Sequence, residues 1–465
     1  MFGRGAIRIA VAAAVVGLSA FPGTGSAVAA KPPSVDPGVM PTGPSTGPPT
    51  DTEQGANGAC FNTQSGGDGP SIPQAQQALG IDKAWQFSRG AGQLVAVIDT
   101  GVAPNPRLPG MIGGGDFVSH TNGTEDCDAH GTFVAGIIAA RQVPGQGFAG
   151  VAPDARILSI RQTSSNYQEK GRSKQKGPDD MPDGYGTTQT LAWAVRRAVD
   201  MHATVINMSL TACQPAGRMD DRALGAAVHY ATLHNVVVVA AAGNNDKDCK
   251  DATNPVIDPL DPAADPWSKV DFDVSPARYD DYVLSVGSVN ANGQPSKFTV
   301  PGPWVGVAAP GENLISLDPR ARGTATAKID QQGKVEPISG TSFASPYVAG
   351  VAALVRARYP ELSATEVIKR IEATAHAPAE GWNPYIGYGT VDPEAALTAQ
   401  VPNELPPKIP SPPHTVQLPV PPPPAAPNNT SRNVALIGSA AIGTLAVLGF
   451  LASYPLRRYF GDRED

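Results

Sequence analysis

The sequence predicts an α/β fold in which a mostly parallel sheet is flanked by helices on both faces. Short apolar strand-like runs alternate with helical segments through the middle of the chain, which is typical of parallel strands connected by helices. The chain has 465 residues, and 41% of them are hydrophobic, which is enough for a large core. Its 50 Gly and 47 Pro are too many to spread evenly through that core, so part of the chain is expected to be linker.

Four apolar runs are expected to form strands, and helical segments lie between them. The strand-like runs are 94–98, 157–160, 204–208 and 236–241, and the helical segments are 131–140, 188–200 and 221–234. A late helix over 362–375 begins with Ser363 and Glu366, the two polar positions of a capping box. Two polar stretches, 163–186 and 245–280, break the alternation, and both are expected to be surface insertions.

Both ends of the chain carry signals of export and membrane anchoring. Residues 1–29 are expected to be a signal peptide, because Arg4 and Arg8 precede an apolar run and small residues follow near Ala30. Near the other end, Val434–Tyr454 carries no charge. As a helix of about 21 residues it spans roughly 30 Å, the thickness of a hydrocarbon core, so a transmembrane helix is expected there.

Two arginines after this apolar stretch orient the chain. Arg457 and Arg458 follow it directly, and the positive-inside rule places them in the cytoplasm. We therefore expect a single-pass type I protein of the cell membrane, in contact with lipid through its apolar helix, with its main domain on the extracytoplasmic side. The remaining segments are a Pro/Gly-rich extension over 30–69, a domain over 70–400, a Pro-rich stalk over 401–430 and a cytoplasmic tail over 455–465.

The net charge of the chain and the spacing of its glycines and acidic residues argue against nucleic-acid, dinucleotide and metal binding. The net charge is -7 with the two signs interspersed, so the chain has no basic stripe and nucleic acid is not an expected partner. The turn after Ile98 lacks the Gly-x-Gly-x-x-Gly pattern of a dinucleotide site, and no cofactor is expected. The acidic stretch 246–273 matches no defined metal-binding loop, so it is expected to be solvated surface without a metal.

Four short motifs place polar side chains at strand ends or helix starts. Asp99 ends the first strand, at the edge where open α/β sheets bind ligands. His130 opens a helix, Ser342 opens another where free N–H groups stabilise an oxyanion, and Asn244 offers amide donors after a strand. Pro346 is expected within the first turn of the helix, where proline is tolerated. Taken singly, these residues have ordinary explanations: a turn aspartate, a surface histidine, a helix cap and an Asn-rich turn.

Taken together and in this order, the motifs resemble those of the subtilases. The flanking sequences are Val-Ile-Asp-Thr-Gly, His-Gly-Thr-Phe-Val-Ala-Gly, Ala-Ala-Gly-Asn and Gly-Thr-Ser-Phe-Ala-Ser-Pro, and the resemblance covers roughly residues 70–400. It implies a subtilisin-like three-layer fold and a serine endopeptidase that acts on protein or peptide substrates. By the same resemblance, Asp99 holds and polarises His130, and His130 is the general base for Ser342. Asn244 would bind the oxyanion.

The same resemblance assigns a substrate-binding strand. Ser209 and Leu210 match the strand that pairs with the substrate backbone in the family. A glycine commonly stands where this chain has Thr211, so the threonine side chain is expected to narrow the neighbouring specificity pocket.

The cysteines of an exported chain are expected to form two disulfides. Cys213 and Cys249 follow two consecutive strands, whose ends usually lie close together, so they are expected to pair. Cys60 then pairs with Cys127 by elimination, and the other connectivities stay open at this point.

The order of segments resembles that of the mycosins, the membrane subtilases of type VII secretion systems. This resemblance implies processing of secreted substrates and a type VII secretion membrane complex as partner. The alternative is a structural subunit of that complex whose protease activity is dispensable. About 40 low-complexity residues precede the domain, too few for a folded inhibitory propeptide, so the extension is expected to wrap the domain rather than be removed.

Overall fold

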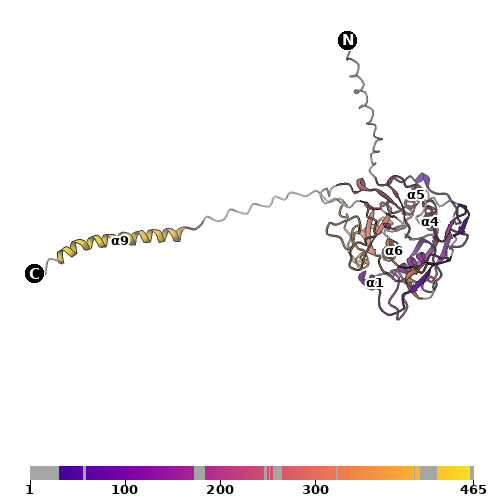
Figure 1. Cartoon of the computed structure of the whole chain (residues 1–465), viewed down its shortest axis with the longest axis horizontal. Helices are drawn as coiled ribbons and strands as arrows, with labels where there is room; N and C mark the ends of the chain where they lie inside the picture. Colours follow the sequence, from indigo (N-terminus) through magenta and orange to yellow (C-terminus); the bar gives the residue numbers. More distant parts are fainter. Residues whose placement is uncertain are drawn as a thin grey trace, which may run out of the picture. The chain divides into compact units, whose positions relative to one another are not determined.

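The computed structural model describes most of the chain. The described residues are 31–44, 46–55, 59–171, 184–245, 249–250, 252–254, 264–320, 323–402, 404–408 and 427–460, with only the backbone of 455–460. They form two compact units, Met1–Ser411 and Pro412–Asp465 (Figure 1). The predicted signal peptide, most of the stalk, most of the acidic stretch 246–263 and the last five residues lie outside the described residues.

A seven-stranded sheet forms the centre of the first unit, and every neighbouring pair in it is parallel. Its order is β12-β11-β9-β7-β3-β5-β4. The strands are β3 (Leu94–Asp99), β4 (Ile112–Asp116), β5 (Arg156–Arg161), β7 (Val205–Met208), β9 (Val237–Ala241), β11 (Val283–Val289) and β12 (Val305–Pro310). The predicted parallel sheet is thus confirmed, with β3 near its middle.

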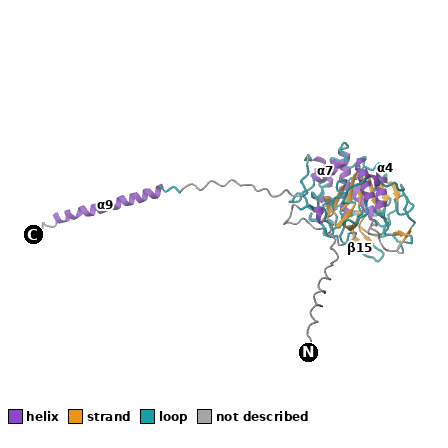
Figure 2. Cartoon of the chain, turned by 90° about the horizontal axis from the view of Figure 1, so that it is seen from above, coloured by secondary structure: helices purple, strands orange, loops and turns teal. Residues whose placement is uncertain are grey.

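Helices cover both faces of this sheet, as predicted (Figure 2). The long helices are α3 (His130–Ala139), α4 (Thr188–Asp200), α5 (Arg222–Leu233), α6 (Thr341–Arg358) and α7 (Ala364–Ala373). Alternate side chains of β3 point to opposite faces, as in any strand. Val97 packs in the core formed with α3 and α6, whereas Ile98 packs in the core formed with α4 and α5. The capping box of Ser363 and Glu366 is present at the start of α7.

The N-terminal extension contains two strands that the sequence did not predict. One of them, β1 (Thr52–Gln54), pairs with β6 (Tyr167–Glu169), and the other, β2 (Asn62–Ser65), pairs with β14 (Thr324–Ile329). Both pairings are antiparallel. The extension therefore wraps the domain by adding strands to it.

Smaller elements complete the first unit. They are η1 (Pro37–Val39), α1 (Gln74–Ala78), α2 (Ile81–Ala84), β8 (Ala212–Pro215), η2 (Pro266–Lys269), β10 (Phe272–Ser275), β13 (Ser316–Leu317), β15 (Val335–Pro337) and α8 (Pro393–Thr398). The expectation that 245–280 is a surface insertion is wrong for its last part. There β10 pairs with β8, and the buried Trp267 packs edge-on against Trp304, so this segment contributes its own small core.

Two disulfides join the pairs expected from the sequence. Cys60 is bonded to Cys127, and Cys213 is bonded to Cys249. The first bond ties the extension to the loop before α3, and the second ties β8 to the segment after β9. In the chain-entropy model, loops of these lengths stabilise the folded state by roughly 3 to 5 kcal/mol each.

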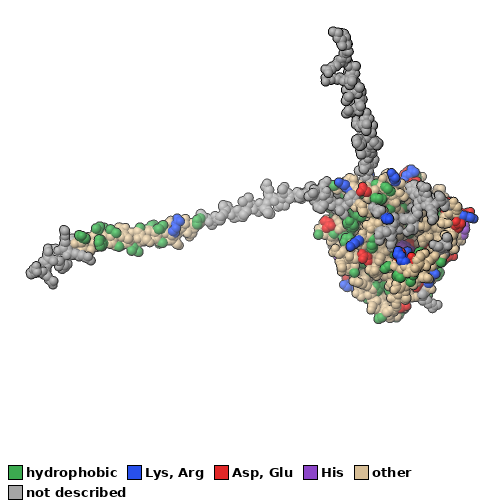
Figure 3. Space-filling model, in the orientation of Figure 1, with side chains coloured by type: hydrophobic (Ala, Val, Ile, Leu, Met, Phe, Trp, Pro, Cys, Tyr) green, Lys and Arg blue, Asp and Glu red, His purple; other side chains and the backbone are tan. Residues whose placement is uncertain are grey.

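The second unit contains one long helix, α9 (Thr430–Phe460). Its segment Thr430–Tyr454 is long and apolar enough to cross a membrane, and it includes the predicted span. Hydrophobic side chains lie along most of this helix and are exposed within the unit (Figure 3). An exposed apolar surface of this length is stable in lipid rather than in water, so the chain is membrane-anchored.

Candidate active site

Asp99 and His130 meet where β3 ends and α3 begins. The carboxylate Oδ1 of Asp99 lies 2.7 Å from Nδ1 of His130, and it also accepts a hydrogen bond of 2.8 Å from the N–H of Thr100. The Asp99 side chain is fully buried, whereas that of His130 is 24% exposed. The carboxylate thus holds one edge of the imidazole inside the protein and leaves the other edge accessible.

Local backbone geometry explains why His130 is so close to β3. Ala129, just before it, has the left-handed φ of 65°, which turns the chain sharply into α3. The next residue, Gly131, packs on the backbone of Gly101, whose carbonyl oxygen would lie 2.0 Å from a Cβ at position 131. Only glycine fits there, so the motif His-Gly brings the imidazole to the end of the strand.

Ser342 lies in the first turn of α6 and lines the same cleft as His130. The helix starts at Thr341, so Pro346 lies beyond the first turn, contrary to the prediction from the sequence. Proline has no N–H for the carbonyl four residues earlier, which is that of Ser342. The hydroxyl of Ser209 donates to this carbonyl instead, at 2.6 Å, and so offsets part of the lost helical hydrogen bond.

The start of α6 is also tied to the end of β7 by side chains. Asn207 donates to the hydroxyl of Ser209 at 2.9 Å and accepts from the hydroxyl of Ser345 at 2.8 Å. All three residues are buried. Satisfied buried polar networks of this kind specify one arrangement, so Ser342 is held in a fixed place relative to the sheet.

Asn244 is oriented by the residue before Ser342. Its Oδ1 accepts from the N–H of Thr341 at 2.9 Å and from the Thr341 hydroxyl at 3.1 Å. These contacts assign the carbonyl end of the amide, because only an oxygen can accept both. Nδ2 is therefore the donor end of a side chain that lines the cleft together with Ser342.

The cleft has a volume of about 160 Å³ and two walls that carry polar side chains. One wall contains Ser209, Leu210 and Thr211, the segment between β7 and β8 that the sequence assigned to substrate binding. The other contains Lys328 and Glu336, on the adjacent strands β14 and β15, with their charged groups 3.1 Å apart. The sequence analysis missed this second wall, because nothing in a short polar hairpin indicates that it reaches the site.

The electrostatics of His130 favour its protonated form. Burial alone lowers the pKa of this imidazole, but the negative charge and the hydrogen bond of Asp99 outweigh burial, and the pKa is raised above 6.5. The imidazole is thus a stronger base than an ordinary histidine. With Nδ1–H donated to Asp99, Nε2 is the atom that accepts a proton.

The described residues contain no group of three or more His, Cys, Asp or Glu side chains placed to hold a metal ion. The arrangement of an acid, an imidazole, a hydroxyl at a helix start and an amide donor is suited to acyl transfer.

Comparison with known proteins agrees with this geometry. Residues 90–389 match the Subtilase family. Mycosin-4 and Mycosin-3 of Mycobacterium tuberculosis are 47% and 46% identical, over 84% and 90% of this chain and 84% and 91% of theirs. The crystal structure of MycP1 from the ESX-1 type VII secretion system is 45% identical, with a TM-score of 0.73, and the match covers 80% of this chain and 97% of that one.

A protein in the structure of an intact ESX-5 inner membrane complex is 41% identical, with a TM-score of 0.75, over 91% of this chain and 99% of that one. The chain belongs to the subtilase family of serine proteases and, within it, to the mycosins. It is a subtilisin-like serine endopeptidase, as the sequence predicted.

Proposed function

We propose that this chain hydrolyses protein or peptide substrates on the extracytoplasmic side of the cell membrane, with Ser342 as nucleophile, His130 as general base and Asp99 as its partner. The observation that carries the proposal is the 2.7 Å contact between Asp99 and His130 in a cleft that Ser342 also lines. The proposal includes membership of a type VII secretion membrane complex, in which the protease processes secreted substrates.

The reaction follows from the geometry of the cleft. The Ser342 hydroxyl attacks the scissile carbonyl and passes its proton to Nε2 of His130, which then donates it to the leaving amine. Asp99 stabilises the imidazolium formed in between. The Asn244 amide and the Ser342 N–H, at the start of α6, bind the oxyanion, and each such donor contributes about 3 kcal/mol to transition-state stabilisation. Water then hydrolyses the acyl-enzyme by the same steps.

Substrate binding is assigned to the wall that follows β7. Ser209 and Leu210 would pair with the substrate backbone as an added strand. The Thr211 side chain is buried in this wall, which supports a narrow pocket for the substrate side chain next to it. Small side chains on the substrate are therefore favoured before the scissile bond.

Membrane topology and assembly rest on the second unit and on the relatives. The apolar Thr430–Tyr454 segment contacts lipid, and the arginines after it favour the cytoplasm for the C-terminus. Solved structures of ESX-5 inner membrane complexes contain similar chains that cover 91% and 84% of this one. The complete set of Asp99, His130, Asn244 and Ser342 favours a working protease over a purely structural subunit of such a complex.

The test is covalent labelling of the full-length protein in membranes with a fluorophosphonate probe, which reacts with activated serines. Wild type and the Ser363→Ala variant, altered at an exposed helix cap, should label equally, whereas Ser342→Ala should not label. Labelling of Ser342→Ala would overturn the assignment of the nucleophile. A folded wild type that does not label would overturn the protease proposal in favour of the structural subunit.

A further inference from the structure

Asp126 takes no part in the proposed reaction. Its side chain nevertheless accepts hydrogen bonds from Thr100, which follows Asp99, and from Thr132, two residues after His130. We propose that Asp126 is a positioning residue, whose carboxylate clamps the segment after Asp99 to the first turn of α3 and so fixes the distance between Asp99 and His130. This inference rests on the proposed function, because it concerns the same pair.

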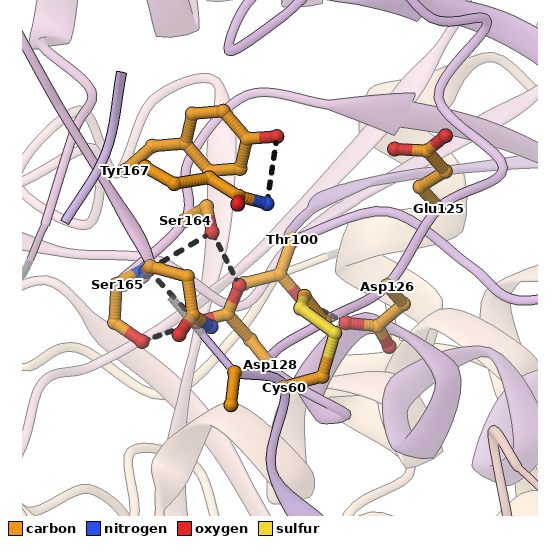
Figure 4. The surroundings of a disulfide bond; sticks show 12 residues. Cys60, Thr100, Glu125, Asp126, Asp128, Ser164, Ser165 and Tyr167 are labelled. Carbon is orange, nitrogen blue, oxygen red and sulfur yellow. Dashed lines mark hydrogen bonds between the residues drawn. A yellow bond between two sulfur atoms is a disulfide. The ribbon is translucent and has the colours of Figure 1, made fainter. Parts of the chain in front are cut away.

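The first arm of the clamp runs through Thr100. The Thr100 hydroxyl donates to Oδ1 of Asp126 at 2.8 Å (Figure 4). The same hydroxyl accepts from the N–H of Gly131 at 2.9 Å. Thr100 directly follows Asp99, and its own N–H binds the Asp99 carboxylate. Gly131 directly follows His130. One hydroxyl therefore connects the residues next to the acid and the base, and Asp126 determines the direction in which this hydroxyl donates.

The second arm runs through Thr132, two residues after His130. Its N–H and its hydroxyl both donate to Oδ2 of Asp126, at 2.8 and 2.6 Å. The same hydroxyl accepts from the N–H of Ala103 at 2.9 Å. Thr132 is fully buried and Asp126 is half-buried, so water competes only partly for these bonds.

The two segments touch so closely that small shifts are costly. Gly101 has a φ of 97°, and a Cβ there would lie 1.9 Å from the carbonyl oxygen of Glu125. The loop 123–126 is thus in contact with the turn after β3 on one side and leads directly into α3 on the other. The hydrogen bonds that Asp126 accepts help to fix the register of this contact, together with the backbone hydrogen bond from Val102 N–H to the Gly123 carbonyl.

The chemistry of the clamp requires a carboxylate. Three donors converge on Asp126, two on one oxygen and one on the other, and it receives them without donating in return. An asparagine of the same size has only one accepting oxygen, so its amide N–H group would meet a donor. Asp126→Asn therefore loosens one arm with little change in volume.

Asp128 provides a matched comparison in the same loop. Its carboxylate accepts from the Ser164 hydroxyl at 2.6 Å, the Ser165 N–H at 2.9 Å and the Ser165 hydroxyl (Figure 4). Ser165 lines the substrate cleft. Asp126 should therefore act on the chemical step, and Asp128 on substrate binding.

The experiment measures kcat and KM of the full-length protein for an internally quenched peptide that the wild type cleaves, together with the rate of fluorophosphonate labelling. Asp126→Asn should lower kcat and the labelling rate roughly 10- to 100-fold with KM within about twofold, because small misplacements of catalytic groups cost this much. Asp128→Asn should chiefly raise KM. Assays run well below the melting temperature of each variant, measured in parallel.

Thr132→Val, which keeps the shape and removes one hydroxyl, should lower the labelling rate in the same direction, and the double variant with Asp126→Asn should be no slower than the slower single variant. Wild-type rates for Asp126→Asn, or a change confined to KM, would overturn the positioning role. If Asp126→Asn does not fold, Thr132→Val decides alone, and wild-type labelling by it overturns the proposal. Absence of labelling in the wild type would instead contradict the proposed function.

Discussion

The two faces of the central sheet carry helices of different kinds. On the face with the active site, residues 131–139 of α3 and 341–355 of α6 are all buried. On the other face, α4 and α5 bury one side fully and leave the other side mostly half-buried. His130 and Ser342 lie at the starts of the buried helices, and the described site takes no catalytic group from α4 or α5.

Complete burial explains why the first face suits the proposed catalytic residues. Small residues let these helices approach their neighbours closely: a Cβ at Gly136 would lie 2.4 Å from Oγ of Ser316, and one at Gly350 2.5 Å from Cβ of Val151. A helix packed on every side cannot tilt or slide without disrupting the core. Its first turn is therefore a rigid platform, which catalysis requires.

The largest expected effect on kcat comes from a substitution at Asp99, on the active-site face of the sheet. Asp99→Asn keeps the size of the side chain but no longer selects the tautomer of His130 that leaves Nε2 as base. We expect kcat to fall about ten-thousandfold with little change in the unfolding temperature. Steady-state kinetics beside thermal unfolding will check this. A fall of less than tenfold would mean that Asp99 does not orient the base.

A smaller effect on kcat is expected from core substitutions, and it should differ between the two faces of the sheet. Ile138 of α3 and Leu191 of α4 are both fully buried, on opposite faces. Changing either to Ala should lower the free energy of unfolding by about 3 kcal/mol, through the cavity left behind. Only Ile138→Ala should also lower kcat, by severalfold. Equal effects of the two variants on kcat, measured where both are folded, would contradict the platform interpretation.

The smallest expected effect is a shift in pH dependence. His130 must be neutral to accept a proton, so kcat/KM should rise with pH through the pKa of this residue. Because the charge of Asp99 raises that pKa, the midpoint should lie above 6.5. The charge of ionised Asp126 also raises the pKa of His130, whereas the charge of Lys328 lowers the pKa of His130.

Asp126→Asn should therefore move the midpoint of the kcat/KM profile down by a fraction of a pH unit. Lys328→Met should move it up. A wild-type midpoint at or below 6.5 would show that burial of the imidazole, rather than the charge of Asp99, dominates.

The sequence predicted the central architecture because it depends on local patterns. A short apolar run such as 94–98 is typical of a strand that is buried between two layers of helices. The capping box at Ser363 indicates the start of a helix without any contact from distant parts of the chain. The four motifs of the proposed active site could be recognised for the same reason, since each combines a strand end or a helix start with a polar side chain. The Cys213–Cys249 disulfide followed from the order of the strands, and the Cys60–Cys127 pair followed by elimination.

The missed features depend on partners that are distant in the chain. Residues 52–54 and 62–65 are polar and low in strand preference, and they become strands only because β6 and β14 offer free edges. Asp126 is similar, because an acid in a loop is common and only the folded structure brings Thr100 and Thr132 to it. The same holds for the hairpin that carries Lys328.

The disulfide between Cys60 and Cys127 limits which fragments of the N-terminal extension can leave the protein after a proteolytic cut. It closes a loop over a sequence separation of 67 residues that contains β2. A backbone cut inside this loop leaves the two fragments covalently joined until a reductant opens the bond. A cut before Cys60 frees β1 but leaves β2 on its edge of β14. Complete removal of the extension therefore requires both a hydrolysed peptide bond and a reduced disulfide.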